Sequence, residues 1–208
     1  MWHNPDMSDA EGSTGLRRAV LVVALLNLGY FGVEFAVATA IGSVSLFADS
    51  IDFLEDASIN LLILVALGWS APRRARLGKA LAAILLVPGF ATLWTAWAKF
   101  SLPVAPAPLP LTLTGTGALV VNLACALILT RYRHHSGSLT RAAFLSARND
   151  TFANVAIIAT GFVTAATQSP WPDLVVGLAI AAVNADAARE VFAAARKEHR
   201  AAVEEAAP

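Results

Sequence analysis

Long apolar stretches alternate with short polar segments along nearly the whole chain. A helix needs about 20 predominantly apolar residues to cross a bilayer, because each residue rises only ~1.5 Å. By this measure the pattern predicts six spanning helices, at about residues 19–41, 45–69, 79–100, 111–130, 141–167 and 173–188. Prolines between the third and fourth stretches mark a turn, because proline cannot continue a helix: Pro103, Pro106, Pro108 and Pro110. The predicted fold class is an all-α membrane protein with six transmembrane helices.

Composition supports this class and excludes others. Of 208 residues, 57% are hydrophobic and 14% are charged, and the mean hydropathy is +0.62, which is too apolar for an ordinary soluble domain. The formal net charge of +0 gives no basic face for nucleic acid, so no nucleic-acid partner is expected. The lone cysteine, Cys125, excludes an internal disulfide and thiolate clusters. Any metal chemistry must therefore use oxygen or imidazole ligands.

Basic residues gather on one side of the predicted spans. Arginines precede the first span, lie between the second and third and between the fourth and fifth, and follow the sixth, whereas the opposite loops carry almost nothing basic apart from Lys99. Short basic loops stay on the cytoplasmic side of a membrane. We therefore predict that both termini are cytoplasmic.

The same pattern predicts the domain organisation. Residues 1–16 are polar, lack the pattern of a cleaved signal peptide and are expected to form a cytoplasmic N-terminal lead-in. Residues 17–190 are expected to form the six-helix transmembrane domain. Residues 191–208, rich in Ala, Glu and Arg, are expected to form a short cytoplasmic tail.

Four acids interrupt the second apolar stretch: Asp49, Asp52, Glu55 and Asp56. Asp52 and Asp56 are four residues apart, so they share one helix face; Asp49 lies within ~60° of Asp52, and Glu55 lies on the other flank. Carboxylates at bilayer depth persist only beside a polar interior, a partner or a cation. Two like charges one turn apart suit a shared divalent ion. The alternative is a first helical turn whose acids face water and complement the helix dipole, which fits Asp49 better than the deeper Asp56.

The fifth apolar stretch repeats this arrangement. Ser146 and Asp150 are four residues apart, and Asn154 extends the same stripe by one turn. Arg148 lies ~200° from Ser146 around the helix, so it is expected to pair with an acid elsewhere or to reach the cytoplasmic interface. Because the second and fifth spans run in opposite directions, the two pairs could face each other around one cation.

Three segments carry a resemblance to a known family. They are GSVSLFADSIDFLEDASINLL in the second span, FLSARNDTFANVAII in the fifth and WPDLVVGLAIAAVNADAAREV in the sixth. Together with Glu34, which follows Tyr30-Phe31-Gly32, they resemble the cation diffusion facilitator family of divalent-metal transporters over roughly residues 17–197.

The resemblance implies a metal site and an activity. Family members bind one zinc-like ion midway through the membrane with a [His/Asp]xxxAsp pair on the second helix and a HisxxxAsp or AspxxxAsp pair on the fifth. By position these become Asp52 and Asp56, then Ser146 and Asp150. The resemblance also implies metal efflux, a homodimer, and integral location in the membrane, for a bacterial protein the inner (plasma) membrane. No prosthetic group is expected, since the metal would be the transported substrate.

This sequence departs from the family pattern in two respects. Ser146 stands where a histidine is common, so the site would have three carboxylates plus water or Asn149. A site without imidazole favours harder cations, which leaves Mn²⁺, Co²⁺, Fe²⁺ and Cd²⁺ open beside Zn²⁺. The chain is also expected to be a short form without the usual cytoplasmic C-terminal domain. Residues expected around the site or along the pathway are Asp49, Glu55, Asn149, Asn154 and Glu34.

Two functional hypotheses follow. The first is a proton-coupled efflux antiporter in which metal displaces protons from Asp52, Asp56 and Asp150. The second is a non-transporting membrane subunit that kept the scaffold but lost transport when the fifth-span histidine became Ser146. An enzyme is not expected, because the sequence has neither HExxH nor GxSxG. A cation channel fits less well, since acids on two helices suit a chelating site better than a ring.

Overall fold

The computed structural model describes residues 5–66, 89–130 and 137–184, without the side chains of residues 5–13, 63, 65, 66 and 137–149. Within these ranges the chain forms six helices and no strand. They are α1 (Pro5–Ile41), α2 (Val44–Ala66), a helix over residues 89–101, α4 (Pro108–Thr130), α5 (Gly137–Thr167) and a helix over Trp171–Asn184. The predicted all-α fold with six helices is confirmed.

The helix limits differ from the prediction mainly at their ends. α1 begins at Pro5, well before the apolar stretch, because proline is pre-organised for the first position of a helix and the polar residues that follow can continue it in water. The predicted third span agrees with the helix over 89–101, while its first part, residues 79–88, lies outside the described residues. The ends predicted for the second and sixth spans, 67–69 and 185–188, lie outside them as well.

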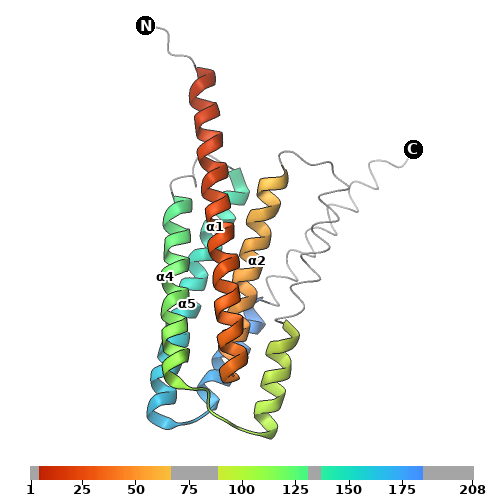
Figure 1. Cartoon of the computed structure of the whole chain (residues 1–208), viewed down its shortest axis with the longest axis vertical. Coiled ribbons are helices and arrows are strands. Elements are labelled where there is room, and N and C mark those ends of the chain that lie inside the picture. Colours follow the sequence, from red (N-terminus) through yellow and green to blue (C-terminus); the bar gives the residue numbers. More distant parts are fainter. Residues whose placement is uncertain (1–4, 67–88, 131–136, 185–208) are drawn as a thin grey trace, which may run out of the picture.

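The helices run up and down side by side as an elongated bundle (Figure 1). The connections 42–43, 102–107 and 168–170 all lie at one end of this bundle, at the bottom of Figure 1. We call it the outer end, because the distribution of arginines predicts that it faces away from the cytoplasm. α1 packs against α2 and α4, and α5 packs against α4 and α2.

The pattern of exposed and buried side chains is the one expected for a protein surrounded by lipid. On α1, Leu25 and Leu28 are exposed, whereas Asn27 and Glu34 are completely buried. Three helices are long and apolar enough to cross a membrane: Thr14–Ile41, Pro108–Thr130 and Asp150–Thr167. α2 has 23 residues, about 35 Å at 1.5 Å per residue, and it also has the length to cross a ~30 Å hydrocarbon core.

A tight turn joins α1 to α2 at the outer end. Gly42 has φ +62°, and the Ser43 amide donates to the carbonyl of Ala38 at 3.1 Å, as in a Schellman motif where glycine takes the left-handed position. Ser43 then caps α2, because its Oγ accepts a hydrogen bond from the Leu46 amide at 3.2 Å. The two helices therefore leave this turn antiparallel and in a fixed register.

Asp173 completes the cap of α2 from another part of the chain. Its carboxylate accepts hydrogen bonds from the amides of Val44 at 2.9 Å and Ser45 at 3.2 Å. The sequence places Asp173 near the start of the last helix, where it is expected to cap that helix. This prediction is wrong, because the carboxylate accepts from the start of α2, while at its own helix the Oγ of Ser169 accepts a hydrogen bond from the Trp171 amide at 3.3 Å.

A buried ion pair neutralises this carboxylate. The Nζ of Lys99 lies 2.5 Å from Oδ2 of Asp173, and the two side chains are 6% and 0% exposed. Gly177, one turn further along the same helix, has no room for a side chain, since a Cβ there would lie 2.6 Å from the amide nitrogen of Ser45. The helix over 89–101, the α1–α2 turn and the last helix are therefore locked together at the outer end.

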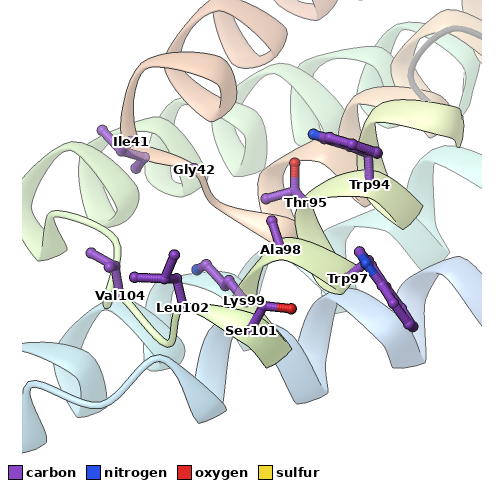
Figure 2. A pocket seen from close by; sticks show the side chains of 10 residues that line it. All are labelled: Ile41, Gly42, Trp94, Thr95, Trp97, Ala98, Lys99, Ser101, Leu102 and Val104. Atoms are coloured by element: carbon purple, nitrogen blue, oxygen red, sulfur yellow. The ribbon is translucent and has the colours of Figure 1, made fainter.

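A pocket of about 410 Å³ opens beside this network (Figure 2). Its walls come from the end of α1, from the helix over 89–101 and from the segment that follows it, and they include Ile41, Trp94, Trp97 and Lys99. Trp94 and Trp97 are 74% and 71% exposed, as is typical of tryptophans at a membrane interface. None of the described residues that line this pocket is an acid, so it is not a candidate for the cation site.

Candidate metal-binding site in the membrane domain

The acids of α2 lie inside the bundle. Asp49 is 0% and Asp56 is 5% exposed, while Asp52 and Glu55 are partly exposed. None of the four is in the first turn of α2, and Asp56 lies about 18 Å past the start of the helix at 1.5 Å per residue. The alternative in which Asp49 faces water and complements the helix dipole is therefore wrong.

Asp150 and Asn154 lie on the described part of α5. Asp150 is partly exposed and Asn154 is completely buried. The Nδ2 of Asn154 donates to the backbone carbonyl of Asp150 at 2.8 Å, and on α2 Asn60 donates in the same way to the carbonyl of Asp56, also at 2.8 Å. Each helix thus holds an aspartate followed one turn later by a buried asparagine whose Oδ1 has no hydrogen-bond partner among the described groups.

The carboxylates of α2 and α5 are electrostatic neighbours. Among the charged groups that the structure describes, Asp150 of the facing helix acts most strongly on Asp52, and Asp56 acts most strongly on Asp150. The antiparallel packing of α2 and α5 therefore brings Asp52 and Asp56 near Asp150. In the described part of the chain, no group of three His, Cys, Asp or Glu side chains is arranged to hold a metal ion.

Three residues of the predicted site region cannot be placed in this geometry. Ser146, Arg148 and Asn149 belong to α5, but their side chains lie outside the described ones. Their predicted roles as ligand, ion-pair partner and additional ligand stay predictions.

Glu34 and Asp49 come together across the α1–α2 hairpin. Both side chains are 0% exposed, and each carboxyl group is within hydrogen-bonding reach of the other. The sequence singles out each acid separately but does not predict the pair. The length of the turn could have predicted this contact. The connection has only two residues, so α1 and α2 form an antiparallel hairpin. Glu34 lies about 10 Å before the end of α1 and Asp49 about 8 Å past the start of α2, and the two residues therefore reach similar depth.

Fold and site together define an integral membrane protein that carries acidic side chains in its interior. The family model described as the cation efflux transmembrane domain matches residues 20–198. The chain belongs to this cation efflux family, so the resemblance drawn from its motifs is confirmed. No curated protein matches the sequence. Membership makes the protein a transporter of the cation efflux class, and a divalent metal cation is its substrate.

Proposed function

We propose that the chain exports a zinc-like divalent cation in exchange for protons. The ligands are Asp52 and Asp56 on α2 and Ser146 and Asp150 on α5. The observation that carries this proposal is the electrostatic proximity of Asp52 and Asp150 across two helices. Two aspartates that face each other inside a membrane domain repel, and a divalent cation between them removes that repulsion.

Proton exchange follows from the chemistry of the ligands. A carboxylate binds metal only when it is deprotonated, so metal binding releases protons and reprotonation releases metal. Metal would enter from the cytoplasm, displace protons from Asp52, Asp56 and Asp150, and leave at the outer end when the carboxylates are reprotonated. Alternating access would come from rocking of helix groups around this site, as in other secondary transporters.

The preference for a particular metal depends on whether the site contains softer ligands such as imidazole. Three carboxylates and one hydroxyl suit hard cations better than a site with imidazole does, so Mn²⁺, Fe²⁺ and Co²⁺ compete with Zn²⁺ as substrates, and Cd²⁺, a softer cation than Zn²⁺, is the least favoured of the alternatives. Amide oxygens of Asn149 or Asn154 would fill remaining coordination positions. Glu55, on the flank of α2, would stay outside the coordination sphere.

Assembly and location belong to the same proposal. We place the protein in a bacterial inner membrane with both termini in the cytoplasm, as a homodimer. Residues 17–190 would form the transporting unit, preceded by the lead-in 1–16 and followed by the tail 191–208. Arg17 and Arg18 lie on α1 about 35 Å before its last residue, Ile41, at the outer end, and basic residues at this end of a span favour this orientation.

A second candidate is a non-transporting membrane subunit. It is favoured by the lack, among described residues, of a group of three side chains arranged to hold a metal. In this case the acids of α2 would serve helix packing or pair with Arg148.

Calorimetric titration of the purified protein separates the two candidates. We expect saturable binding of at least one divalent metal, and a loss of affinity of at least about tenfold in Asp52→Asn, because a ligand charge is removed without a change of shape. Thr116→Val, an exposed position of α4, is the matched control and should bind like the unmodified protein. Absence of saturable binding for every metal would support the non-transporting subunit.

A further inference from the structure

Glu34 and Asp49 are the most completely buried acids among the described residues near the proposed metal site. Both are 0% exposed, and none of their four carboxyl oxygens accepts a hydrogen bond from another described group. Asp52 and Asp150, in contrast, are partly exposed. Unpartnered buried carboxyl oxygens are rare, because burial removes their hydration without replacing it.

The contact between the two acids identifies what is missing. Their carboxyl groups lie within hydrogen-bonding reach of each other, yet two ionised carboxylates are acceptors only and cannot hydrogen-bond. One proton on either acid supplies the donor. The same proton also reduces two buried negative charges to one.

The groups around the pair that the structure describes offer no other way to neutralise it. Tyr30 on α1 uses its hydroxyl proton in a hydrogen bond to the carbonyl of Thr114 at 2.5 Å. Among the side chains that the structure describes, the titratable groups near the pair on α2 and α5 are the acids Asp52 and Asp150, and α4 carries only Cys125.

Among described cationic side chains, none neutralises the pair. Lys99 is engaged by Asp173 at the outer end. Arg17 and Arg18 precede Glu34 on α1 by about 24 Å or more at 1.5 Å per residue. Negative groups therefore surround the pair in the part of the chain that the structure describes.

We infer that Glu34 and Asp49 form a proton-binding site, separate from the metal ligands, that holds one shared proton while both side chains are buried. Its ligand is a proton taken up from and returned to water during the transport cycle. This inference rests on the proposed proton exchange and adds a second place where protons bind.

The position of the pair gives it a role in that cycle. Asp49 lies one turn closer to the outer end than Asp52. Beyond it, a cluster of buried apolar side chains closes the bundle, including Ala38, Leu46 and Phe47. The pair thus lies between the proposed metal ligands and the outer end, and it can exchange its proton with water only when the helices move.

Infrared spectroscopy of the purified protein in lipid nanodiscs at neutral pH tests the site without a transport assay. In difference spectra between the unmodified protein and each variant, we expect both Glu34→Gln and Asp49→Asn to lose the carbonyl stretch of one protonated carboxyl group, since the amide then donates to an ionised partner; bands from protonated metal ligands cancel in the difference. Thr39→Val, an exposed position on α1, is the control and should retain the band. Difference spectra in which neither variant loses such a band would overturn the inference.

Transport measurements distinguish this site from the metal ligands. In proteoliposomes, Glu34→Gln should keep most of the metal-for-metal exchange at equal pH and lose most of the metal uptake driven by a pH gradient. Equal retention of both activities would show that the pair does not take part in coupling. If the unmodified protein shows no exchange at all, the transport proposal fails, while the infrared band still decides whether the proton site exists.

Discussion

Replacing Asp56 with alanine is expected to abolish metal transport, and replacing Asp150 with alanine is expected to do the same. Each change removes a negatively charged ligand from a different helix. Loss of a supporting residue around a metal site typically costs 10–100-fold, so loss of a ligand should reduce metal-dependent flux by about 100-fold or more. The measurement is metal-dependent proton flux into proteoliposomes that hold equal amounts of each variant.

The controls for these variants separate chemistry from folding. Asp56→Asn keeps the shape of the side chain and the backbone carbonyl that accepts from Asn60, so it should fold normally and still lose transport. Thr116→Val should transport like the unmodified protein. If both alanine variants transport normally, the metal site has been placed on the wrong residues.

Lys99→Met is expected to produce the largest loss of stability. It leaves Asp173, which is 0% exposed, without its counter-charge, and breaking a buried ion pair by removing one partner costs about 3–5 kcal/mol. The carboxylate keeps hydrogen bonds from the hydroxyls of Ser43 and Ser45, at 2.6 and 2.7 Å, but these do not replace a full charge. Thermal unfolding in detergent, followed by circular dichroism, measures the effect.

The double variant Lys99→Met with Asp173→Asn tests the mechanism of this loss. Removing the orphaned charge should restore part of the stability, because replacing both members of a buried pair is far milder than replacing one. The amide oxygen introduced by the second substitution could still accept from the start of α2. Equal melting temperatures for the unmodified protein and Lys99→Met would show that the ion pair contributes nothing to the fold.

Much of the fold could be predicted from the sequence, because a bilayer imposes a length and a polarity on every helix. Apolar stretches of the required length predicted α4 and the outer part of α1. Of the four prolines predicted to mark a turn, Pro103 and Pro106 lie in the connection before α4, whereas Pro108 and Pro110 belong to the first turn of α4, where proline is tolerated. The start of α1 was missed, because continuing a helix into water has no hydrophobic signal. Pro5 and the polar residues after it are compatible with a helix, but they do not require one.

Only part of the proposed site could be predicted from the sequence. Acids four residues apart in an apolar stretch led to the proposal that Asp52 and Asp56 bind metal, because a helix places them on one face and lipid cannot solvate them; their role as ligands stays a prediction. Contacts between residues far apart in the sequence could not be predicted from such a pattern. Asp173 caps α2 instead of its own helix, and Glu34 meets Asp49, because turns and packing between distant segments decide both contacts.

The proposal that this chain is a proton-coupled divalent-metal exporter is tested most directly by transport in proteoliposomes across a panel of metals at two pH values. The panel should contain Zn²⁺, Mn²⁺, Co²⁺, Fe²⁺ and Cd²⁺. We predict uptake of at least one of them that accelerates when a pH gradient is imposed and is accompanied by proton movement in the opposite direction. Uptake of none of the metals, or uptake that does not respond to the pH gradient, would contradict the account.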